Sequence, residues 1–154
     1  MINEQELLQI INGGESGKVQ FKERLPHSDS LAHEIIAFSN SRGGTIIFGV
    51  NDKTGALNEL SLAEIRQVNQ QAVNVASHKV YPPVYLTSDT VSVKGNQIVV
   101  ISVEEGISKP YKDSFEMTCE EKGLTLEQAH TQMIFQEFKN RLDAATTITF
   151  YTPE

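Results

Sequence analysis

The stretch from Ala37 to Asp52 constrains the fold of this chain more than any other part of it. An apolar stripe of helical spacing runs through residues 28–40 and stops shortly before the pair Gly43-Gly44. A continuous apolar, β-branched run follows over Thr45–Val50, which is typical of a strand buried on both faces of a sheet. The glycine pair either turns the backbone sharply at a φ that a side chain would forbid or simply ends the helix as a C-cap.

Helical and strand patterns alternate through the rest of the first 113 residues. Ser61 is placed to cap a long amphipathic helix, and Gly95-Asn96 predicts a tight hairpin between two strands. The second of these strands is almost wholly apolar, so we expect it to be central in the sheet. Helices are expected over residues 3–12, 28–40 and 61–79, and strands over 18–24, 45–50, 84–94 and 97–104. This mixture predicts an α+β fold with a mixed β-sheet and helices packed on it.

The last part of the chain, residues 114–154, has a different character. Thr125 is placed to cap a helix that runs to about Leu142, and residues 146–152 have the pattern of a strand. A strand so close to the terminus indicates an edge strand or a partner contact, such as a homodimer interface. We therefore expect one domain over residues 1–113, with residues 114–154 packed on it.

Composition limits the kind of partner. The formal net charge is −7, which argues against a protein that coats nucleic acid through its overall charge. Residues 1–113 hold 10 Lys and Arg against 13 Asp and Glu, whereas residues 114–154 hold 3 against 7. Any contact with nucleic acid is therefore expected to be a local patch on the first part of the chain. The single cysteine, Cys119, and the absence of a long apolar run predict a cytoplasmic protein without membrane contact.

Three short motifs stand out by their order and spacing. They are Glu15-Ser16 with Val19-Gln-Phe-Lys-Glu23, the stretch from Ala37 to Asp52, and Lys109-Pro-Tyr111. Together they resemble the Schlafen AlbA-type domain, which is found at the N-termini of bacterial transcriptional regulators and RecG-like helicase-related proteins. The resemblance covers about residues 7–112. It implies an AlbA-like domain that binds DNA; the Arg- and Gly-containing strand with which the family usually continues is not found here.

Schlafen nucleases carry a carboxylate triad that binds a divalent metal, and the resemblance places two of its members on Glu15 and Asp52. The third falls on Gln20, where the family pattern has Glu. A neutral amide offers a hard cation an oxygen without the charge. This departure argues against an enzyme, and it leaves Mg²⁺ or Mn²⁺ as a cofactor only if the chain is a nuclease. Otherwise no cofactor is expected.

The same strand suggests a binding role. Lys18, Gln20, Lys22 and Arg24 share one face by strand alternation, so three cations flank an uncharged polar residue. If that face is open to solvent, the cations would contact phosphates. The alternative is that the strand merely exposes alternating lysines, as many strands do.

The leading interpretation is therefore a domain of a transcriptional-regulator-like protein that binds DNA or RNA. The candidate nucleic-acid contacts are Lys18, Gln20, Lys22, Arg24, Asn40 and Arg42. Two other hypotheses stay open, a metal-dependent endonuclease using Glu15 and Asp52, and a protein-interaction or oligomerisation module that uses the acidic C-terminal part.

Overall fold

The computed structural model of the chain describes residues 2–114 and, beyond them, residues 116–117, 123, 125, 127–128, 131 and 135. The chain divides into two compact units, Met1–Ser114 and Phe115–Glu154. In the second unit the Thr125 hydroxyl accepts from the Gln128 main-chain N–H at 3.2 Å, as the predicted cap requires. The rest of the predicted helix to Leu142, and the predicted strand over 146–152, lie outside the described residues.

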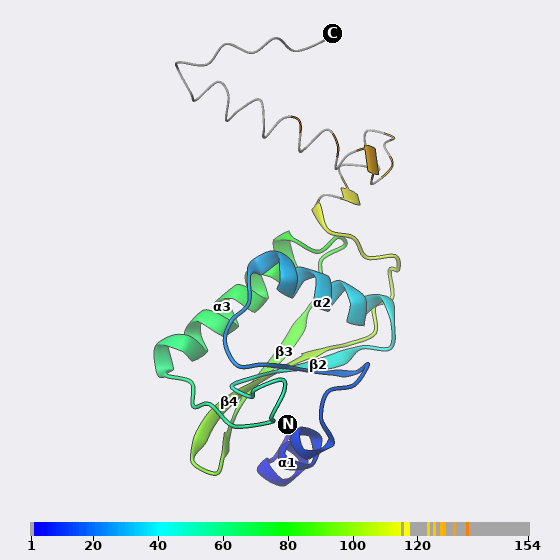
Figure 1. Ribbon diagram of the computed structural model, residues 1–154. Coiled ribbons are helices and arrows are strands. Elements are labelled where there is room, and N and C mark those ends of the chain that lie inside the picture. Colours follow the sequence, from blue (N-terminus) through cyan, green and yellow to red (C-terminus); the bar gives the residue numbers. More distant parts are fainter. Residues whose placement is uncertain are drawn as a thin grey trace, which may run out of the picture. The chain divides into compact units, whose positions relative to one another are not determined.

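The first unit is an α+β domain with a four-stranded mixed sheet, as the sequence predicts (Figure 1). The elements follow in the order α1 (Glu4–Gly13), β1 (Val19–Lys22), α2 (Ser28–Asn40), β2 (Gly44–Phe48), α3 (Leu62–His78), β3 (Leu86–Val93) and β4 (Asn96–Val103). The strand order in the sheet is β1-β2-β4-β3, with β1 and β2 parallel and the other pairs antiparallel. None of the described helices is long and apolar enough to span a membrane.

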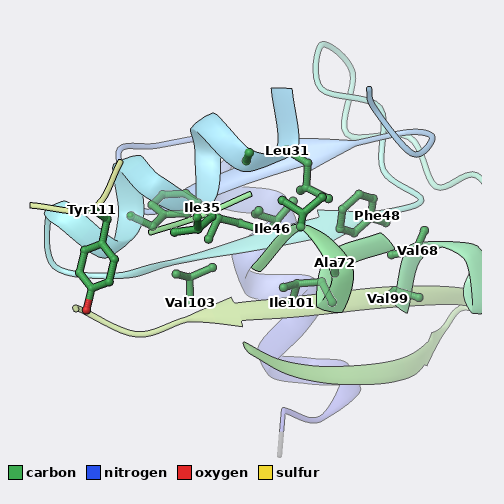
Figure 2. Close-up of a cluster of buried hydrophobic side chains, with 14 of the residues drawn as sticks. Leu31, Ile35, Ile46, Phe48, Val68, Ala72, Val99, Ile101, Val103 and Tyr111 are labelled. Atoms are coloured by element: carbon green, nitrogen blue, oxygen red, sulfur yellow. The ribbon is translucent and has the colours of Figure 1, made fainter. Parts of the chain in front are cut away.

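Helices cover both faces of the sheet, with α2 and α3 on one face and α1 on the other (Figure 1). Side chains of β2 alternate between these faces. Ile46 and Phe48 pack in the cluster under α2 and α3 (Figure 2), and Ile47 packs in the cluster under α1. All three side chains are fully buried, which confirms the prediction of a strand buried on both faces. The central place of β4 is confirmed as well.

Local signals set several of the element ends. The Ser61 hydroxyl accepts from the Glu64 main-chain N–H at 3.1 Å, and the Glu64 carboxylate accepts from the Ser61 N–H in return. This capping box satisfies two of the main-chain donors at the start of α3 that the helix itself leaves unpaired. The predicted cap at Ser61 is therefore confirmed.

The hairpin between β3 and β4 corrects one detail of the sequence analysis. The two loop residues are Lys94 and Gly95, with φ of +51° and +81°, and not Gly95-Asn96. Asn96 pairs with Val93 as the first residue of β4. A carboxylate from another element helps to hold the turn, because the Lys94 N–H donates to Glu4 of α1 at 2.9 Å. That contact spans 90 positions of the chain, so a local pattern gives no sign of it.

Candidate nucleic-acid interface

The turn from α2 into β2 packs against the end of β4. Gly43 has a φ of +81°, and its N–H donates to the carbonyl of Phe38 at 2.9 Å. A Cβ atom at Gly43 would lie 2.6 Å from the carbonyl oxygen of Val103 and 2.9 Å from the nitrogen of Glu105. A Cβ atom at Gly44 would overlap the ring of Phe38. Both glycines therefore serve close packing as well as the turn itself.

Asn40, a candidate for hydrogen bonding to nucleic acid, joins the end of α2 to the loop after β4. Its Nδ2 donates to the carbonyl of Tyr111 at 3.0 Å, and its Oδ1 accepts from the N–H of Tyr111 at 2.7 Å. Tyr111 is buried and lies at one end of the hydrophobic cluster under α2 and α3 (Figure 2). Asn40 is exposed, but both ends of its amide pair with the main chain of Tyr111 and fix the position of the loop.

This loop brings a cation, Lys109, to the glycine turn. The ammonium group donates to the carbonyl of Ser41 at 3.0 Å and to the carboxylate of Glu105 at 2.9 Å. The hydrogen bond from Lys109 holds the pKa of Glu105 below its ordinary value, and the charges of Lys109, Arg42 and Lys18 lower it further. Lys109 is thus the cation in contact with Glu105, whereas Arg42 and Lys18 act on its carboxylate only through their charge.

We call Lys18, Arg42 and Lys109 the turn cluster. Lys18 reaches the turn because its carbonyl accepts from the N–H of Thr45, the second residue of β2, at 2.8 Å. Arg42 directly precedes Gly43. All three side chains are exposed, and each comes from a different segment of the chain. The main chain of two predicted contacts, Lys18 and Arg42, thus lies at the turn to which the ammonium group of Lys109 donates.

The other residues of the predicted strand face lie elsewhere. Gln20 and Lys22 pair in register with Ile46 and Phe48, so their side chains lie on the face that α2 and α3 cover. Lys22 is half-buried and forms an ion pair of 2.6 Å with Glu34 of α2.

Gln20 is also half-buried, and its Nε2 donates to the Ser16 carbonyl at 3.3 Å. Arg24 is exposed beyond the far end of β1, where its charge contributes to lowering the pKa of Glu64, after the larger effect of the hydrogen bonds from Ser61. The four residues therefore do not form one exposed line.

Comparison with known proteins identifies the domain. The family model described as Schlafen, AlbA_2 matches residues 15–124, which is most of the chain. The chain belongs to the Schlafen AlbA_2 family. Its fold is similar to the solution structure of the N-terminal domain of a RecG-related helicase protein from Nitrosomonas europaea, with a TM-score of 0.60 and 21% identity over 74% of this chain and 82% of that one.

A second solved structure is similar over a smaller part of its own length. The DIP2311 protein from Corynebacterium diphtheriae is 21% identical, and the match covers 71% of this chain and 23% of that one with a TM-score of 0.47. No curated protein shows significant similarity to the chain.

The positions of the family's carboxylate triad do not fit a divalent metal in this AlbA_2 domain. The Oε1 atom of Glu15 accepts from the N–H of Phe21 at 2.8 Å, so this carboxylate satisfies a main-chain donor on the free edge of β1. Asp52 is exposed in the turn after β2, and position 20 holds a neutral amide. Within the part of the chain that the structure describes, no three His, Cys, Asp or Glu side chains lie close enough to share a metal ion.

Sequence reasoning missed Lys109 as a member of the site. The motif Lys109-Pro-Tyr111 marked the family resemblance, but nothing in its local pattern shows that the loop returns to Gly43. The sequence offers a partial indication, because Asn40 and Tyr111 both lie in the motifs that carry the family resemblance. Their pairing in space holds the loop from which Lys109 donates to the carbonyl of Ser41, the residue before Arg42.

Proposed function

We propose that this AlbA_2 domain binds nucleic acid, with DNA as the first candidate, and that the turn cluster contacts the phosphates. One observation carries the proposal, namely that Lys18, Arg42 and Lys109 converge from three segments on a single glycine turn. A chain with a net charge of −7 gains nothing for phosphate binding from its overall charge, so a local group of cations is needed. AlbA_2 domains are associated with nucleic-acid binding, which supports the same conclusion.

Glu105 does not prevent phosphate binding at this place. The ion pair between Lys109 and Glu105 is exposed, with relative exposures of 40% and 53% for the two side chains. Exposed pairs of this kind contribute little to stability, so a phosphate can take the place of the carboxylate at small cost. Release of condensed counterions from the nucleic acid then favours the complex.

The family setting suggests a role in a transcriptional-regulator-like protein, in which this domain holds the nucleic acid and does not cut it. Gln20 and Glu15 support the non-catalytic part, because the first is neutral and the second already accepts a main-chain hydrogen bond. The protein-interaction hypothesis rests on residues 114–154, most of which lie outside the described residues, and it stays a prediction.

Fluorescence anisotropy with labelled DNA and RNA at increasing salt tests the proposal. If the turn cluster neutralises three phosphates of duplex DNA, the logarithm of the association constant falls against the logarithm of the salt concentration with a slope of roughly −2.7. Single-stranded and duplex probes of equal length show which form is preferred. Absence of binding at about 50 mM salt, or binding that salt does not weaken, contradicts the proposal.

A further inference from the structure

The loop that carries Lys109 also presents an apolar side chain to the solvent. Ile107 is 99% exposed and follows β4 by four residues. An exposed isoleucine gains nothing from the hydrophobic effect in the free protein. Single exposed apolar residues are common, so exposure alone decides nothing. The contacts of the loop around Ile107 indicate whether this side chain has a role.

The loop holds Ile107 in an outward position. On one side of it, the Gly106 N–H donates to the carbonyl of Ser39 at 2.8 Å. On the other side, the Ser108 N–H donates to the phenolic oxygen of Tyr111 at 3.1 Å. The Tyr111 ring packs so closely on Gly106 that a Cβ atom there would overlap it. The ring fills the inside of the loop, and the side chain between the two anchored residues points away from it.

A cation lies close to this isoleucine along the loop. Lys109 is two residues after Ile107, and its ammonium group donates to the carboxylate of Glu105, two residues before it, and to the carbonyl of Ser41. Among the other exposed large apolar side chains of the first unit, Leu62 and Val73 belong to α3. Tyr85 directly precedes Leu86, which pairs with Val103 at the end of β4 from which the loop continues. A lone isoleucine is far smaller than the roughly 800 Å² per partner that a stable protein interface buries.

An apolar side chain on a braced loop, next to a cation proposed to bind phosphate, matches the chemistry of a base step. Proteins that contact nucleic acid in this way insert Ile, Leu, Met, Phe or Pro between neighbouring bases while cations hold the phosphates. We propose that Ile107 is such a wedge, and that it contacts and partly unstacks bases of the nucleic acid bound at the turn cluster. This inference rests on the proposed function. It extends that function, because the domain would contact bases as well as phosphates. The braced loop lowers the ordering cost of that contact.

Oligonucleotides that contain 2-aminopurine test the wedge, because the fluorescence of this base rises when it is unstacked. The full chain is titrated against a set of such probes, with the salt dependence of binding measured in parallel. The wild-type protein is expected to raise the fluorescence at saturation. Ile107→Ala is expected to abolish that rise and to weaken binding about tenfold. The slope against salt is expected to stay the same, because no charge changes.

Two controls keep the result interpretable. Leu62→Ala removes an exposed apolar side chain at the start of α3 and is expected to change neither signal. Leu62 lies two residues after Leu60, whose N–H donates to the carbonyl of Gln97 at the opposite end of β4. Ile107→Leu keeps an apolar wedge and is expected to retain most of the fluorescence rise. If the wild-type protein fails to bind, the proposed function fails and the wedge with it.

If the wild-type protein binds and Ile107→Ala behaves identically, the wedge is wrong while the proposed function stands. A change of salt slope in Ile107→Ala, or a change in the oligomeric state of the free protein, also overturns the wedge. The first result would show that the residue acts through the loop, and the second that it contacts a protein.

Discussion

The side chain of Asn40 pairs with the main chain of Tyr111 through two hydrogen bonds, 3.0 Å from Nδ2 to the carbonyl and 2.7 Å from the N–H to Oδ1. The pair connects positions 71 residues apart and fastens the loop after β4 to the end of α2. Lys109 and Ile107 owe their positions to this link. The geometry of the proposed interface therefore depends on a residue that touches no phosphate.

Replacing Asn40 by Ala is expected to lower the free energy of unfolding by about 1–3 kcal/mol, because two partly buried main-chain groups lose their partners. Urea denaturation followed by circular dichroism measures the change. Asn40→Asp keeps the acceptor and loses the donor, so its free energy of unfolding should lie between those of the wild-type protein and Asn40→Ala. Affinity for nucleic acid should drop in Asn40→Ala even where the protein is fully folded. Wild-type stability in Asn40→Ala would contradict the anchoring role.

The ion pair between Lys22 and Glu34 yields a second prediction. Both side chains are mostly buried, with relative exposures of 27% and 22%, and Glu34 Oε2 has no hydrogen-bond partner. Lys22→Met would leave the carboxylate without its cation and is expected to cost about 1–3 kcal/mol of stability. The double variant Lys22→Met/Glu34→Gln should recover part of that loss.

Arg24→Met is the matched control for Lys22→Met, since Arg24 is exposed and its replacement should stay within about 0.5 kcal/mol. Nucleic-acid affinity of folded Lys22→Met should equal that of Arg24→Met. A selective loss of affinity in Lys22→Met would restore Lys22 as a phosphate contact.

Variants of Glu15 test whether its carboxylate satisfies a main-chain donor on the free edge of β1 or binds a metal ion. Glu15→Ala removes the acceptor for the Phe21 N–H and is expected to cost about 1 kcal/mol, whereas Glu15→Gln keeps an oxygen there and should cost less. Thermal unfolding with and without millimolar Mg²⁺ or Mn²⁺ completes the test. We expect no metal-dependent rise in the melting temperature. A rise that disappears in both Glu15→Gln and Asp52→Asn would show a metal site.

Glu105 competes with phosphate for Lys109, so Glu105→Gln is expected to strengthen nucleic-acid binding about two- to fivefold. Glu59→Gln makes the same change of charge next to Leu60, which contacts Gln97 at the opposite end of β4, and should have no such effect. Weaker binding by Glu105→Gln would show that the carboxylate positions Lys109 and does not compete.

The pKa of Glu105 sets the pH range over which Glu105→Gln should bind nucleic acid more tightly than the wild-type protein. Because Lys109 lowers that pKa below 4.5, the carboxylate stays charged at neutral pH, and its contribution to stability is lost only as the pH falls below 4.5. The advantage of Glu105→Gln should therefore be constant between about pH 6 and pH 8 and shrink only under acid conditions. Anisotropy titrations across this range check it.

Strand alternation predicted the sheet better than the site. Residues 18–24 showed which side chains share a face, but alternation cannot show whether a helix covers that face. The face of Gln20 and Lys22 is covered by α2, and Glu34, twelve positions further along the chain, neutralises Lys22. The apolar run of β2 and the cap at Ser61 were predictable because hydrophobic pattern and capping are local properties.

The turn cluster depends instead on tertiary packing. Lys18 follows the pairing of β1 with β2, and Lys109 follows the link between Asn40 and Tyr111. Both contacts join segments far apart in the sequence. The resemblance to AlbA domains identified the right segments, and only the fold shows that these segments meet at the glycine turn.

Salt titration of two double variants tests the central claim most directly. Lys18→Ala/Arg42→Ala removes two cations of the turn cluster, and Arg24→Ala/Lys53→Ala removes two exposed cations outside it. The first should weaken binding and reduce the salt slope from roughly −2.7 to roughly −0.9, while the second should keep the wild-type slope. Equal slopes for the two variants, or a loss confined to Arg24→Ala/Lys53→Ala, would contradict phosphate binding at the glycine turn.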